Sequence, residues 1–239
     1  MKKIFFAFCV TMMSVYCTQA QQQRPLYPKS LMNQPGDHFM IQFGSLTWLD
    51  KPDSIRTAGF SRSFNAYFMF NFPFKSNPHF SVGLGLGVGS DNMFFGKTQP
   101  VINGNSAALA FPDKSNTTHF KSFKLVTSYI EAPVELRYMS NTNNINKAFK
   151  VSVGLKAGLL VSAHTKGTTQ QNAANQTIND YTEKIKSSRY FNSTRFSGTF
   201  RIGYGLFSIF STYQLSQFFK EGAGADVRPL TVGLTLSGL

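Results

Sequence analysis

The chain has 239 residues, a formal net charge of +13 and two cysteines. Cys9 and Cys17 both lie in the first 20 residues, so the remainder can form neither a disulfide nor a thiolate metal site. The basic residues are scattered along the chain instead of clustering in one run, which argues against nucleic acid as a partner.

Residues 1–20 have the pattern of a secretory signal peptide. Lys2 and Lys3 precede an apolar region at 4–15, and Thr-Gln-Ala at 18–20 is a small-residue cleavage site. We therefore expect an exported protein, with a net charge of +11 once the two lysines are removed from +13. Because no other run reaches the roughly 18 apolar residues of a spanning helix, insertion into a membrane would have to use strands.

The start of the mature chain is predicted to be irregular. Residues 21–36 combine a run of glutamines with Pro25, Pro28 and Pro35, which predicts an irregular N-terminal leader. A first strand is expected at 37–49, where apolar and polar positions alternate.

Two long alternating stretches follow a predicted loop at 50–59. Even positions of residues 60–74 are mostly phenylalanine, and in residues 80–95 valines and leucines alternate with glycine or serine. A period of two predicts strands, and Lys-Ser-Asn-Pro at 75–78 predicts the turn of an antiparallel hairpin. Both strands exceed the roughly 9 to 11 residues that a tilted transmembrane strand requires.

The same pattern continues to the end of the chain. Further strands are predicted at 120–138, from Phe149 onward, and at about 190–202, 206–218 and 228–239. The connections alternate between short turns, at 75–78, 141–147 and 203–205, and longer polar segments, at 50–59, 96–119, 166–188 and 220–226. Short periplasmic turns and long external loops are typical of outer-membrane barrels.

We therefore predict an all-β fold: an eight-stranded antiparallel up-and-down transmembrane β-barrel over residues 37–239, located in the cell outer membrane. The alternative is a secreted β-sandwich, which is less favoured because sandwich strands are nearer 5 or 6 residues.

Charged residues within the strands predict the contents of the barrel. A charge on the lipid face near the midplane costs roughly 2 to 4 kcal/mol, so these side chains should face the lumen. Their parity agrees, and the predicted structural charge network comprises Glu131, Glu135, Arg137, Lys150, Lys156, Arg195 and Arg201. We expect Lys156, Arg195 or Arg201 to neutralise the two glutamates. The functional alternative is an ion or proton path through the lumen.

Three short motifs resemble a known family. Tyr-Ile-Glu-Ala-Pro-Val-Glu-Leu-Arg-Tyr at 129–138 looks like the signature strand of the PorT-like family of small outer-membrane barrels. Ile-Gly-Tyr-Gly at 202–205 and Pro-Leu-Thr-Val-Gly-Leu-Thr-Leu at 229–236 resemble its closing strands. The resemblance implies an eight-stranded barrel in the outer membrane. The family takes its name from a component of a protein-secretion and gliding system, although most members have no assigned role.

The leading functional hypothesis is a non-enzymatic barrel with a structural, adhesive or complex-forming role through its external loops. Expected partners are outer-membrane lipids and lipopolysaccharide, with other envelope proteins as an alternative; no cofactor is expected. The alternatives are a secretion-apparatus component, a narrow channel, and a lipid hydrolase using Ser162, His164 and Glu183 near the outer rim.

Overall fold

The computed structural model describes residues 39–142 and 144–238. The predicted signal peptide at 1–20, the leader at 21–36 and the first two residues of the expected barrel lie outside this part of the chain. Within it, no helix is long and apolar enough to cross a membrane.

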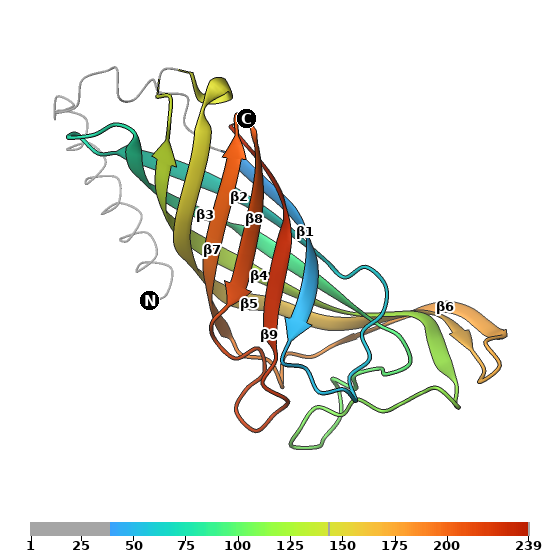
Figure 1. Ribbon diagram of the computed structural model, residues 1–239. Coiled ribbons are helices and arrows are strands. Elements are labelled where there is room, and N and C mark those ends of the chain that lie inside the picture. The colour runs from blue at the N-terminus through green and yellow to red at the C-terminus, as the bar shows by residue number, and fades with distance from the viewer. Residues whose placement is uncertain (1–38, 143, 239) are drawn as a thin grey trace, which may run out of the picture. The chain divides into compact units, whose positions relative to one another are not determined.

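The described residues form one antiparallel sheet (Figure 1). Its strands are β1 (Phe39–Leu49), β2 (Arg62–Pro73), β3 (Phe80–Phe95), β4 (His119–Met139), β5 (Phe149–Gln171), β6 (Thr177–Lys186), β7 (Thr194–Tyr204), β8 (Phe207–Gln214) and β9 (Arg228–Ser237). A short 3-10 turn, η2 (Ile145–Lys147), precedes β5.

Hydrogen bonding closes the sheet into a barrel. Neighbouring strands follow the order β4-β3-β2-β1-β9-β8-β7-β5, and β5 pairs back with β4. This ring contains eight strands, so the predicted eight-stranded barrel is confirmed. The ninth strand, β6, pairs with the outer part of β5 and stands outside the ring, where Figure 1 shows it projecting beyond one end.

The barrel wall exposes apolar side chains and buries charged ones, which is the reverse of the arrangement in a water-soluble protein. Leu155 on β5 is 63% exposed, whereas Glu131 on the neighbouring β4 is 1% exposed. Large apolar side chains face outward on all eight strands of the ring, for example Phe64, Leu86 and Phe200, each about half exposed or more. A continuous apolar outer band around a polar interior is the pattern of a barrel that faces lipid.

The short turns gather at one end of the barrel, with one boundary displaced from its predicted position. Residues 203–205 were predicted to form a turn, but Gly203 and Tyr204 belong to β7, and the chain reverses at Gly205 and Leu206. Of residues 203–205, only Gly205 has a positive φ, +60°, which a glycine adopts without steric cost. Its N–H donates to the carbonyl of Ala148 at 2.9 Å, which ties this turn to the neighbouring one.

The segment at 166–188, predicted as an irregular polar connection, instead forms a β-hairpin. β5 continues to Gln171, and after a tight turn β6 returns along it. Asn175, at φ 61°, forms this turn, and its N–H donates to the carbonyl of Asn172 at 2.9 Å. The hairpin is solvated on much of its surface, so backbone hydrogen bonds hold it and no alternation of apolar residues marks it in the sequence.

The external connections pack into an apolar cap over the opposite end of the barrel. Trp48 lies at its centre, with ring centroids 5.6 Å from Phe95, 5.2 Å from Phe218 and 5.8 Å from Phe219. The cap comprises Leu46, Trp48, Ile55, Met93, Phe95, Ile102, Leu109, Phe123, Leu125, Ala163, Tyr190, Phe191, Phe218, Phe219, Ala223 and Val227. Tyr190 and Phe191 were predicted in the sixth strand, and Phe218 in the seventh, but all three belong to this cap.

A row of glycines in β3 gives interior side chains the space they need. A Cβ on Gly83 would lie 2.6 Å from Nε of Arg137, and one on Gly87 would lie 2.1 Å from the carbonyl oxygen of Ala66. Gly89 similarly faces Glu131 Oε2 at 2.9 Å. Gly83 and Gly89 therefore leave room for the charged side chains of Arg137 and Glu131, and Gly87 lets β3 approach the backbone of β2 closely.

We expect Gly87→Ala to destabilise the barrel by about 1–3 kcal/mol, because the added methyl group meets the backbone of β2, which cannot yield as a flexible side chain would. Gly198→Ala is the matched control, since nothing lies within 4 Å of its added Cβ. Urea unfolding of the two refolded variants measures the difference. Equal stabilities would show that the glycine row has no steric role.

Candidate functional site

Buried charges are concentrated in the barrel interior. All seven residues of the predicted network lie on lumen-facing positions and are less than 9% exposed. The structure adds Asp91 of β3 as a third buried carboxylate, so three acidic and five basic side chains share the described interior. They fall into two clusters along the barrel.

The first cluster is centred on Glu131. Its carboxylate accepts hydrogen bonds from Arg195 Nε at 2.6 Å and from Arg195 Nη2, and Lys156 Nζ lies 3.1 Å away. Tyr67 donates its hydroxyl proton to the other carboxylate oxygen and accepts from Lys156 at 3.1 Å. Arg195 Nη1 also reaches Asp91 at 2.5 Å. These contacts join five strands: β2, β3, β4, β5 and β7.

The second cluster is centred on Glu135. This residue lies four positions after Glu131 on β4, toward the barrel end that carries the short turns. One oxygen of its carboxylate accepts from Arg137 Nε and from Arg201 Nη2, each at 2.9 Å. Arg201 also donates to Ser237 Oγ at 3.2 Å, which connects this cluster to β9. Lys150, the remaining predicted member, is buried on the lumen face near the start of β5.

Sequence reasoning identified both glutamates and their cationic partners but not Asp91 or Tyr67. Both occupy lumen-facing positions of their strands. Asp91 lies two residues after Gly89 on β3, and Tyr67 lies two residues after Asn65 on β2, so each shares the inward face of that residue. The alternating pattern could therefore have found them. Arg195 also stacks on Tyr129, with its guanidinium carbon 3.8 Å from the ring centroid.

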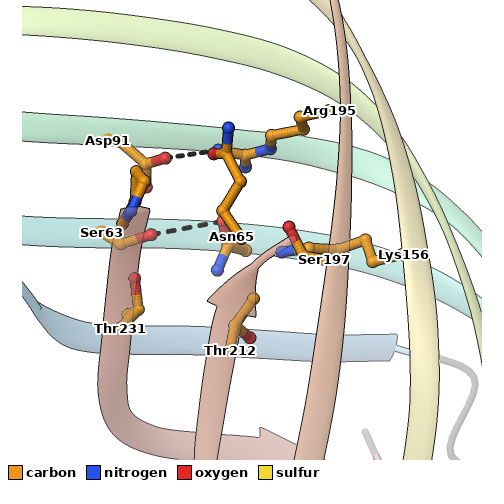
Figure 2. Close-up of a pocket in the computed structure, with 10 residues that line it drawn as sticks. Ser63, Asn65, Asp91, Lys156, Arg195, Ser197, Thr212 and Thr231 are labelled. Atoms are coloured by element: carbon orange, nitrogen blue, oxygen red, sulfur yellow. Dashed lines mark hydrogen bonds and ion pairs between the residues drawn. The ribbon is translucent and has the colours of Figure 1, made fainter. Parts of the chain in front are cut away.

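Polar side chains fill the lumen beside the first cluster (Figure 2). The figure shows Asp91 joined to Arg195, and Ser63 donating to Asn65 at 3.5 Å. A cavity of about 10 Å³ remains between these residues and Thr212, enough for about one water molecule. This cavity is too small for an organic ligand, because pockets that bind small organic molecules typically measure about 300 to 1,000 Å³.

This arrangement favours a structural role for the charges over a chemical one. Each of the three buried carboxylates contacts at least one guanidinium or ammonium group, and the cavity that Asp91 lines, of about 10 Å³, holds about one water molecule. A general acid or base would need access to a substrate. The interior instead resembles a set of cross-braces between strands.

The residues considered for lipid hydrolysis do not assemble. Ser162 and His164 lie two positions apart on β5 and share its outward face. Glu183 pairs with Gly167, whose parity places it on the opposite face of the sheet, where it lines a separate cavity of about 100 Å³ with Phe120 and Ile185. His164 Nδ1 has no hydrogen-bond partner within the described residues, so no group orients the ring as a base.

Comparisons with known proteins identify the class and the family. The fold and the polar, ion-paired lumen define a small transmembrane barrel. The sequence profile of the "Outer membrane protein beta-barrel domain" family matches residues 31–222, and the chain belongs to that family. It is therefore an outer-membrane protein. This match identifies the broad family and does not separate PorT-like proteins from its other members.

A search of curated proteins found no match. Among solved structures, the chain is similar to the attachment invasion locus protein Ail of Yersinia pestis. The sequences are 14% identical, the match covers 83% of this chain and 94% of Ail, and the TM-score is 0.36.

Glu131→Gln is expected to lower the free energy of unfolding by about 3–5 kcal/mol, because Arg195 and Lys156 would remain buried with less negative charge to compensate them. The matched control is Asp226→Asn, which breaks the exposed 3.0 Å pair with Arg228 and should cost less than about 1 kcal/mol. Urea titration in detergent measures both. If the two variants lose equal stability, the lumen pairs are not the main braces.

Proposed function

We propose that this outer-membrane barrel is a non-enzymatic docking protein that binds another protein through its external end. The observation that carries this proposal is the β5–β6 hairpin. β6 pairs with β5 on one edge, and no strand covers its other edge within the described residues. An uncovered strand edge offers a row of backbone donors and acceptors to an extended segment of a partner.

The hairpin also presents apolar side chains to its surroundings. Ile178 is 52% exposed and Tyr181 is 41% exposed, although both lie outside the lipid-facing band. The Tyr181 ring packs against Phe120 of β4 at a centroid distance of 5.8 Å, which links the hairpin to the barrel wall. A tyrosine that is anchored on one side and exposed on the other can contribute strongly to a protein interface.

The cap gives this external end a defined shape. Tyr190 donates its hydroxyl proton to the carbonyl of Gly104 at 2.7 Å, and the Leu109 N–H donates to the carbonyl of Ala223 at 2.8 Å. These bonds join connections that are distant in sequence. Ordered connections on a rigid barrel lose less conformational entropy on binding than mobile ones, which supports a role in adhesion or complex formation.

The proposal is tested by placing a photo-crosslinking amino acid at Tyr181 in intact cells. We expect a discrete protein adduct, because this side chain would lie in the interface. Leu234, which is 63% exposed in the apolar band, is the control position and should give lipid adducts only. The identity of the captured protein would separate a secretion-apparatus component from an adhesin. A protein-free result at Tyr181 would contradict the docking role.

A second prediction concerns the narrow-channel alternative. We expect the refolded protein to give no steady unitary current in planar bilayers, because ion pairs occupy the lumen and the apolar cap lies above them. A general porin reconstituted in parallel serves as the positive control. Reproducible current steps from the wild-type protein would make the channel the better reading.

A further inference from the structure

Basic side chains form a row across the outward face of the sheet, above the lipid-facing band. Lys124 on β4 pairs directly with Lys166 on β5, which in turn pairs with Lys184 on β6. The next pair of β5 and β6 residues on the same face sets His164 opposite Lys186. All five positions have the same outward parity, so their charges share one surface.

The row continues toward the membrane through β3 and β2. The ring of Phe94 lies between two cations: its centroid is 5.5 Å from Lys124 Nζ and 5.2 Å from the Arg62 guanidinium carbon. Arg62 follows Phe60 and precedes Phe64, both about half exposed. One end of the row therefore begins among lipid-facing aromatic side chains, and the other end lies on the projecting hairpin.

The position of the lysines relative to the bilayer agrees with this placement. The lipid-facing part of β4 runs from Tyr138 to Ile130, and Lys124 lies six residues beyond Ile130 along the strand. Lysines just outside an apolar band can extend their long side chains toward the headgroup layer.

No carboxylate compensates the row within the described residues. Lys124 Nζ donates to the amide oxygen of Asn92 at 2.8 Å, and none of Arg62, Lys124, Lys166 and Lys184 forms an ion pair there. Like charges directly opposite one another destabilise a sheet. Partial burial, with Lys166 and Arg62 nearby, lowers the pKa of Lys124, and partial burial with Lys184 nearby lowers that of His164.

We propose that Arg62, Lys124, Lys166 and Lys184 form a binding surface for the phosphate groups of outer-leaflet lipid headgroups. The charge is complementary, the surface is continuous with the lipid-facing band, and a bound phosphate layer would relieve the repulsion between opposed lysines. This proposal does not depend on the docking role of the hairpin edge.

The test compares the full-length wild-type protein with the variant Lys124→Gln/Lys166→Gln/Lys184→Gln by native mass spectrometry in detergent. The probes are diphosphorylated lipid A and the same lipid with both phosphates removed. The control variant, Lys97→Gln/Lys121→Gln/Lys220→Gln, removes three exposed external lysines that lie off the row. Heat-modifiable gel migration checks that each protein is folded.

We expect the row variant to bind diphosphorylated lipid A at least about tenfold more weakly than wild type, while the control variant binds it normally. Without lipid, the row variant should melt at the same or a higher temperature, because repulsion has been removed. Equal binding by the row variant, or equal losses in both variants, would overturn the proposal. Binding of soluble dextran sulfate through these lysines, with no preference for the phosphorylated lipid, would also overturn it.

Discussion

The structure depends on the requirement that a charge inside a closed eight-stranded barrel meet an opposite charge. Glu131 satisfies this requirement with Lys156 on the neighbouring strand β5 and Arg195 on β7, the next strand in the ring. Without those cations, the buried carboxylate would keep the Tyr67 hydroxyl as a hydrogen-bond donor but no opposite charge, which costs several kcal/mol. The pairs therefore select one arrangement of strands as well as neutralising charge.

This requirement explains features that otherwise look unrelated. β3 contains a glycine at each of four successive lumen-facing positions because residues of both neighbouring strands crowd this face: Arg137 and Glu131 of β4 lie over Gly83 and Gly89, and β2 lies against Gly85 and Gly87. The opposite face of the same strand carries apolar residues such as Leu84 and Leu86, which contact lipid. One strand thus combines an almost empty inner face with an apolar outer face, and residues of both neighbouring strands fill the space.

Filling the lumen also determines where the protein can act. The small polar cavity beside Arg195 has room for about one water molecule, so binding of larger partners must occur elsewhere. The external end supplies two distinct surfaces, the open edge of β6 and the basic outward face that crosses β4, β5 and β6. The first suits an extended polypeptide and the second an anionic layer, and the same hairpin can present both.

The transmembrane part of the fold was predictable from sequence because successive strand residues alternate between two different environments. Lipid on one side and a packed polar interior on the other impose strict alternation, so strand number and lumen-facing residues such as Glu135 and Arg201 followed from parity. The external part was not predictable in this way. β6 has no buried face to produce alternation, and cap residues such as Ile102 and Leu109 are single apolar side chains within polar segments. Only the folded barrel brings them together.

The central claim is that the Glu131 cluster acts as one brace, and a double-mutant cycle tests it most directly. Glu131→Gln, Arg195→Gln and the double variant would be unfolded in urea beside the wild-type protein. If the two side chains stabilise the barrel through their mutual contact, the double variant will lose less stability than the sum of the single losses, by roughly 1–3 kcal/mol. Additive losses would contradict the account, because they would show that each side chain acts independently within the lumen.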